Sequence, residues 1–115
     1  MYCTSTGVVR NLAEAVKWYR RSAEQGDRYA QYNLAIMVLK GQGTARDAEN
    51  AFQWCTAAAE QGLPEARFQL GEFYAAGLGT GADLAAARSW YEKAASQGNA
   101  EAASRLQLLR DTLTA

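Results

Sequence analysis

The sequence contains no histidine, the side chain that most often serves as a general base, a metal ligand or a pH switch. Only two cysteines are present, Cys3 and Cys55. Without histidine, two thiolates do not complete a tetrahedral zinc site unless carboxylates join them, and the sequence shows no such cluster. We therefore expect no metal site, no cofactor and no catalytic residues.

An excess of charge and long apolar runs are also lacking. Twelve basic residues balance twelve acidic ones, so no net field draws the chain toward nucleic acid or anionic lipid. No segment reaches the apolar length of a membrane span, and residues 1–10 have no signal-peptide core. We expect no nucleic-acid binding and no membrane insertion. A cytoplasmic and a periplasmic location both stay open.

Proline occurs once, while alanine is abundant and favours helix. The glycines therefore mark special places, and most of them recur with a period of 36 residues. The same period relates aromatic, alanine and leucine positions, which indicates an internal repeat. The recurring sets include Trp18, Trp54 and Trp90; Gly26, Gly62 and Gly98, each after a glutamine; Gly7, Gly43 and Gly79; Ala15, Ala51 and Ala87; and Leu34, Leu70 and Leu106.

Each period predicts two helices. In residues 63–98, Pro64 suits the first position of a helix, and Gly77 and Gly79 interrupt that helix. Asp83 can then cap the second helix, as Asp47 and Asn11 can in their copies, while Asp27 and Asn99 can cap first helices. The predicted helices are roughly 11–25, 28–40, 47–61, 64–76, 83–97 and 100–112.

The opening repeat is incomplete in this prediction. Met1 and Tyr2 align with Phe73 and Tyr74, near the end of a first helix. We therefore expect one domain, 1–115, composed of a partial repeat 1–26, repeats 27–62 and 63–98, and a capping helix 99–115. The tryptophans beside the alanine positions are predicted to lie in the core between helices.

These residues closely resemble the Sel1-like repeat, a branch of the tetratricopeptide superfamily. The family pattern places Ala-x-x-Trp-Tyr-x-x-Ala-Ala-x-x-Gly on the second helix after a Gly-x-Gly loop, and residues 66–98 match it nearly throughout. Residues 30–62 depart from it at Ala35, Val38 and Cys55, which replace glycine, tyrosine and tyrosine. The resemblance implies an all-α, right-handed superhelical solenoid of antiparallel helix pairs.

The resemblance also implies a non-enzymatic adaptor or scaffold that binds proteins, and the alanine-rich, tryptophan-bearing repeats suggest a bacterial source. The alternative is a structural or regulatory spacer of a larger protein, with no ligand of its own. An enzyme or a cell-wall-active protein is a distant third hypothesis. The Gly-x-Gly loops follow helices rather than strands and lack a third glycine, so they do not form a nucleotide-binding fingerprint.

The tetratricopeptide pattern places ligand-facing positions on the first helix of each pair, lining a concave surface. Carried onto this sequence, these positions predict a protein-binding or peptide-binding site, and the mixed charge there favours apolar anchors over a phosphate clamp. Ordinary surface remains an equal alternative for these side chains. The candidate residues are Tyr29, Tyr32, Ile36, Leu39, Lys40, Glu65, Phe68 and Glu72.

Two further hypotheses concern individual segments. Helix 11–25 carries Trp18 and Tyr19 without most of its partner helix, which predicts either a covering segment or self-association through this N-terminal helix. Cys3 and Cys55 occupy non-equivalent repeat positions, so Cys55 is predicted to be a buried free thiol rather than half of a disulfide.

Overall fold

The computed structural model describes residues 5–114, and the side chains of residues 11–111. The described part contains six helices and no strand, and the molecule measures 50 × 28 × 27 Å along its principal axes. The helices are α1 (Ser5–Glu24), α2 (Arg28–Lys40), α3 (Ala48–Glu60), α4 (Pro64–Ala76), α5 (Leu84–Ser96) and α6 (Ala100–Thr114).

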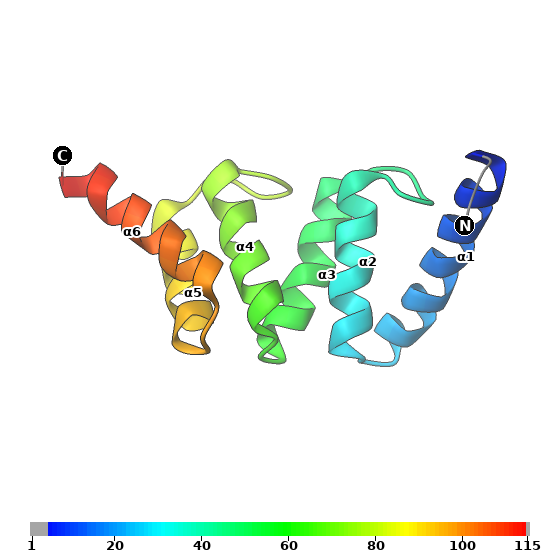
Figure 1. Ribbon diagram of the computed structural model, residues 1–115, viewed down its shortest axis with the longest axis horizontal. Coiled ribbons are helices and arrows are strands. Elements are labelled where there is room, and N and C mark those ends of the chain that lie inside the picture. Colours follow the sequence, from blue (N-terminus) through cyan, green and yellow to red (C-terminus); the bar gives the residue numbers. More distant parts are fainter. Residues whose placement is uncertain (1–4, 115) are drawn as a thin grey trace.

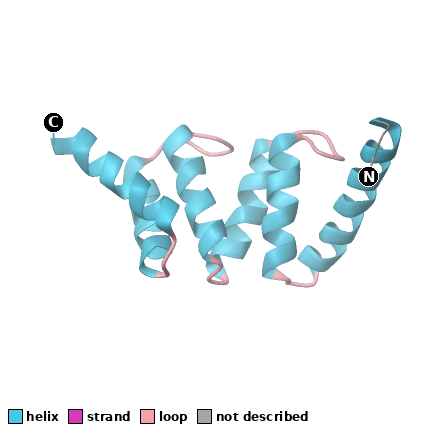
Figure 2. Cartoon of the chain, in the orientation of Figure 1, coloured by secondary structure: helices cyan, strands magenta, loops and turns pink. Residues whose placement is uncertain are grey.

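Each helix packs against the next one along the chain, and the six follow one another along the long axis (Figure 1). The longer loops, which join α2 to α3 and α4 to α5, lie at one edge of the molecule. The tight turns that join α1 to α2, α3 to α4 and α5 to α6 lie at the opposite edge (Figure 2). The predicted all-α solenoid of antiparallel helix pairs is confirmed.

Four helices begin at the predicted cap residues, whose side chains satisfy free backbone amides of the first turn. Asp27 Oδ1 accepts from the amides of Tyr29 and Ala30 at 2.9 and 3.0 Å. The Oδ1 atoms of the other three caps each accept a hydrogen bond from a backbone amide: Asp47 from Asn50, Asp83 from Ala86 and Asn99 from Ala102. Helix α4 starts at Pro64 without a side-chain cap, as proline allows.

The predicted start of the first helix is wrong. Helix α1 begins at Ser5 rather than near residue 11, so Asn11 lies inside it and Gly7 is helical rather than part of a loop. Inner repeats end their first helix at Gly41 and Gly77, which have φ of 71° in the left-handed region. Ser5 occupies the equivalent position and carries a side chain that disfavours this conformation. The alignment of Met1 and Tyr2 lies outside the described residues.

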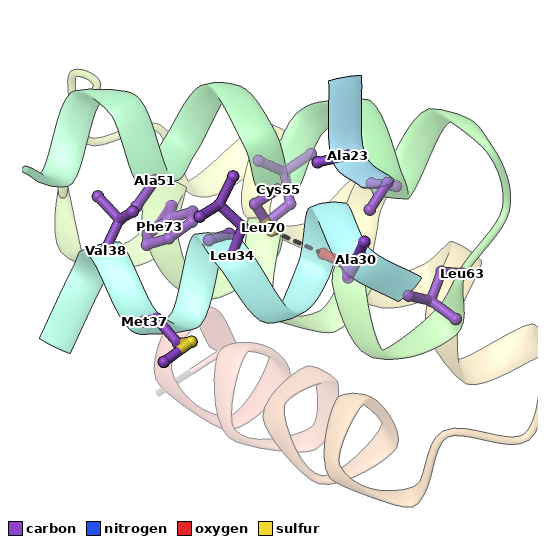
Figure 3. Packing of buried hydrophobic residues seen from close by; sticks show 14 of the residues in the cluster. Ala23, Ala30, Leu34, Met37, Val38, Ala51, Cys55, Leu63, Leu70 and Phe73 are labelled. Carbon is purple, nitrogen blue, oxygen red and sulfur yellow. Dashed lines mark hydrogen bonds between the residues drawn. The ribbon is translucent and has the colours of Figure 1, made fainter. Parts of the chain in front are cut away.

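The buried hydrophobic side chains form two clusters, a larger one from α1 to α4, part of which is drawn in Figure 3, and a smaller one on α5 and α6. Leu34, Leu70 and Phe73 are almost completely buried. Ala58, Ala59 and Ala94 are also fully buried. Their lack of bulk allows the helix backbones to approach closely, as predicted.

The tryptophan stripe is only partly core. Trp54 and Trp90 are half-buried and pack against the main cluster, as predicted. Trp18, in contrast, is 68% exposed, so its assignment to the core was wrong. Within residues 5–114, α1 packs against α2, and no described helix covers the side of α1 that carries Trp18.

Two loop glycines fix the spacing between repeats. Gly43 and Gly79 have φ of 76° and 69°. A Cβ built on Gly43 would lie 2.8 Å from the amide nitrogen of Ala13 and still closer to the carbonyl of Leu12 on α1. A Cβ on Gly79 would lie 2.8 Å from the carbonyl carbon of Ala48 on α3. Each long loop therefore rests directly on the backbone of the preceding repeat.

A comparison of Gly43 with Gly62 separates two contributions to the free energy of unfolding, the backbone strain at a positive φ and the contact between repeats. Gly62 also has a positive φ, but its Cβ would meet only the tip of the Arg67 side chain at 3.9 Å. We expect Gly62→Ala to cost about 1 kcal/mol through strain alone, and Gly43→Ala to cost clearly more. Urea unfolding followed by circular dichroism measures both. Equal losses would show that the loop contact with α1 adds no stability.

Candidate protein-binding face

The predicted binding residues all lie on first helices. We call them together the first-helix face: Tyr29, Tyr32, Ile36, Leu39 and Lys40 on α2, and Glu65, Phe68 and Glu72 on α4. The spacing of Tyr29, Tyr32 and Ile36 places them along one side of α2. Tyr29 is 56% exposed, and Lys40 and Glu65 are also exposed. The other members are half-buried.

The environment of Tyr32 includes charged groups of two other first helices. The pKa of Tyr32 is raised above its usual value, chiefly by burial and then by Cys55, Glu65 and Glu101. Glu65 lies on α4 and Glu101 on α6, so the side chains of three successive first helices influence one phenol. This geometry brings together residues that are far apart in sequence.

Phe68 and Glu72 belong to a packed network on the same side. The hydroxyl of Tyr91 donates to Glu72 Oε2, and Arg105 donates to both oxygens of Glu72 at 3.1 and 3.2 Å. The ring of Phe68 lies 5.9 Å from that of Tyr91 and 5.9 Å from the Arg105 guanidinium carbon. Burial and then the hydrogen bond to Glu72 raise the pKa of Tyr91. The network joins α4, α5 and α6, so Glu72 has a structural role.

Tyr29 and Leu39 differ in what they contact. The guanidinium of Arg28 lies 5.2 Å from the centre of the Tyr29 ring and also donates to the carbonyl of Gln61 at 3.2 Å. Leu39 is half-buried and packs against the core cluster. Tyr29 therefore offers a large apolar surface and is not among the side chains packed against the core.

The departures of the second repeat from the family pattern compensate one another. A Cβ on Gly71 would lie within 2.6 Å of the Tyr91 ring, so glycine makes room for that ring. One repeat earlier the equivalent positions are Ala35 and Cys55, both fully buried. The smaller thiol leaves space for the methyl group, and its Sγ donates to the carbonyl of Ala66 at 3.2 Å, the dashed line in Figure 3.

A ladder of polar side chains along the tight-turn edge was missed by sequence reasoning. Gln61 donates to the carbonyl of Gly26 at 2.9 Å, and Gln97 donates to that of Gly62 at 2.7 Å. Gln31 and Arg67, which are also equivalent, donate to the carbonyls of Ala23 and Ala59 at 3.2 and 3.0 Å. The sequence did contain a signal for these hydrogen bonds, the Gln-Gly pair that recurs once in each repeat. Helix packing does not require a glutamine at that position.

The thiol of Cys55 is free and buried, as predicted. Burial raises its pKa to about 12, which makes it a poor nucleophile at neutral pH. Cys3 lies outside the described residues. Within the part of the chain that the structure describes, no group of three histidine, cysteine or carboxylate residues could hold a metal ion.

The helices, their pairing and their loops define a helical-repeat protein of the tetratricopeptide-like class. The Sel1 repeat pattern matches three successive segments, residues 1–27, 28–63 and 64–99. The chain therefore belongs to the Sel1 repeat family. Proteins of this family are generally interaction scaffolds that bind other proteins, and the family is of a non-catalytic type.

Solved structures of bacterial proteins show the same fold. A Sel1 repeat protein from Oxalobacter formigenes is 42% identical, with a TM-score of 0.78, over 80% of this chain and 69% of that one. The protein c5321, a protective antigen of uropathogenic Escherichia coli with an SLR fold, is 39% identical, with a TM-score of 0.81, over 82% of this chain and 20% of that one. The cysteine-rich protein B of Helicobacter pylori, at 21% identity, a TM-score of 0.75 and coverage of 79% and 68%, shares the fold.

No protein with a curated description matches the chain significantly. None of the helices within residues 5–114 is long and apolar enough to cross a membrane.

A double-mutant cycle tests the compensation between Ala35 and Cys55. We expect Cys55→Tyr to destabilise the fold, because the methyl group of Ala35 occupies the place where Gly71 leaves room for a ring. Adding Ala35→Gly should recover about 1–3 kcal/mol of that loss. The measurement is urea unfolding of the wild type, both single variants and the double variant. Strictly additive effects would refute the compensation.

The buried thiol also predicts a pH dependence. Folding raises the pKa of Cys55, because the buried thiol favours its protonated form. The contribution of this thiol to the free energy of unfolding is therefore fully present below the pKa that it has in the unfolded chain. That contribution should be lost as the pH rises from about 9 toward 12. Comparison of Cys3→Ser with Cys3→Ser/Cys55→Ala by urea unfolding isolates the effect from tyrosine ionisation. Parallel pH profiles of the two variants would contradict it.

Proposed function

We propose that this chain is an adaptor that holds a peptide or a segment of a partner protein on its first-helix face, the predicted concave surface. The observation that carries the proposal is the Tyr29 ring, which is 56% exposed. Tyrosine is enriched among the residues that dominate binding energy at protein interfaces. Its repeat equivalent is Glu65, so the repeat fold does not need an aromatic ring there.

The other side chains of the face favour a partner with apolar anchors and flanking charges. Tyr32, Ile36 and Phe68 are half-buried and offer apolar contact beside Tyr29. Lys40 and Glu65 are exposed and opposite in sign, which disfavours a clamp for phosphate or for a single carboxylate. An extended or helical peptide with an aromatic or aliphatic anchor suits such a surface.

The carboxylates narrow the chemistry of the partner further. Glu65 and Glu101 both act on the phenol of Tyr32, whereas Glu72 is already bound by Arg105 and Tyr91. A lysine or arginine next to the apolar anchor would meet the negative charges of Glu65 and Glu101 and the π-face of Tyr32. Glu72 would shape the face through its network rather than by contributing a free charge.

A second candidate function is that of a structural or regulatory spacer without a ligand of its own. One comparison favours it: the chain spans 20% of the E. coli antigen. A stretch of repeats of this length therefore also occurs within a much longer protein, where stacking on neighbouring segments can be its role.

Peptides selected from a random display library against the purified chain test the adaptor function. We expect the selected peptides to carry an apolar anchor beside a basic residue, and Tyr29→Ala to weaken their binding about tenfold or more, measured by fluorescence polarisation. The matched control is Leu84→Ala on the second helix α5, where Leu84 is 48% exposed.

The outcomes separate the two candidate functions. Binding that is lost in Tyr29→Ala and retained in Leu84→Ala supports the first-helix face. Binding that survives Tyr29→Ala refutes this face as the site. A library that yields no binder supports the spacer.

A further inference from the structure

Helix α1 presents a surface that the other second helices do not. Trp18 is 68% exposed, whereas Trp54 and Trp90, one and two repeats on, are half-buried against the core. The side chains Glu14, Lys17, Trp18 and Arg21 line a surface depression of about 180 Å³. The opposite side of the helix carries Val16, which is 6% exposed and belongs to the core.

The spacing of the four lining residues is that of a helix-packing hole. They stand at positions i, i+3, i+4 and i+7, the set that surrounds a side chain inserted from a facing helix. The one large apolar side chain of this set is Trp18. Two copies of α1 that cross antiparallel, with a two-fold axis between Lys17 and Trp18, would place the two Trp18 rings against each other.

Glu14 and Arg21 become complementary under the same symmetry, whereas Lys17 faces its own copy. Glu14 and Arg21 lie at equal sequence distances from the point between Lys17 and Trp18. An antiparallel pair therefore sets Glu14 of each copy opposite Arg21 of the other, twice, around a central pair of indole rings. A contact in which residue i meets j and j meets i is the property of a two-fold interface.

We propose that the outward side of α1, formed by Glu14, Lys17, Trp18 and Arg21, is a docking surface for a second copy of this chain. The two copies pair through antiparallel α1 helices about a two-fold axis. The contact involves one helix from each copy, so the dimer is weak and depends on concentration.

An open head-to-tail assembly does not fit the same surface. It would pair α6, a first helix, with α1 of the next copy, a second helix, in the geometry found within a repeat. In that geometry Gly71 makes room for Tyr91. On α6 the equivalent of Gly71 is Gln107, and on α1 the equivalent of Tyr91 is Tyr19. The glutamine side chain would occupy the space of the ring, so the closed two-fold pair is favoured.

Pairing at α1 would join two solenoids end to end and leave both first-helix faces available. A dimer of this kind engages a partner with two binding segments more tightly than one copy does, because the second contact becomes intramolecular. The proposed self-association involves only Trp18 and its neighbours on α1. It does not depend on whether the first-helix face binds a partner.

Sedimentation velocity of the 115-residue chain, from low micromolar to near-millimolar concentration, tests the proposal. We expect a reversible monomer–dimer equilibrium that Trp18→Ala abolishes. Glu14→Arg and Arg21→Glu should each weaken the dimer at least tenfold, and the double variant Glu14→Arg/Arg21→Glu should restore most of the loss. Each altered residue is exposed, and thermal unfolding by circular dichroism verifies that the variants fold.

The control is Tyr29→Ala, which should leave the dimer unchanged while weakening peptide binding, so the two proposals fail independently. A chain that stays monomeric at every concentration overturns the α1 proposal. A dimer that persists in Trp18→Ala, or a double charge reversal that restores nothing, also overturns it. Assemblies that grow beyond the dimer would show head-to-tail stacking instead.

Discussion

The close contact between each long loop and the backbone of the preceding repeat governs the rest of the structure. Gly43 lies on Leu12 and Ala13, and Gly79 lies on Ala48. These contacts set the distance at which successive helix pairs stack, and that distance decides which side chains can fill the space between them. A single pair of 13-residue helices buries too little surface by itself, so most of its stability comes from such neighbours.

Within this fixed spacing, the two complete repeats fill the same volume in different ways. The third repeat uses a tyrosine against glycine and ties the hydroxyl of Tyr91 to Glu72 and Arg105. The second uses the smaller pair Cys55 and Ala35, with Ile36 at the position of Glu72. The two changes offset each other in part, since the smaller Cys55 side chain stands opposite the larger Ala35. The first-helix face therefore varies from repeat to repeat above a nearly constant framework.

The repeat period, the helix pairs and four of the caps could be predicted from the sequence, because each follows from a local residue preference repeated in register. Asp47 and Asp83, for example, cap whatever helix follows them. The early start of α1 and the exposure of Trp18 could not be predicted in this way. Both depend on what packs against α1 in three dimensions, and a local sequence pattern does not encode that.

The candidate face was predicted only as a set of positions. The sequence placed Tyr29 and Glu72 in the same class, yet one is largely exposed and the other is bound by Arg105. That difference arises from contacts between residues 33 positions apart, and no periodicity encodes them. The influence of Glu101 on Tyr32 likewise acts between residues on different helices, α6 and α2.

The polar ladder gives the solenoid two mechanically different edges. On the tight-turn edge, Gln61 and Gln97 tie each turn to the one before it through short hydrogen bonds. On the loop edge, the glycines maintain contact by fit alone. Tension along the long axis should therefore open the loop edge first, with the hydrogen-bonded edge acting as a hinge. The repeats would then separate at the loop edge while they stay joined at the tight-turn edge. The curvature of the solenoid would change, and it would adjust to the width of a bound partner.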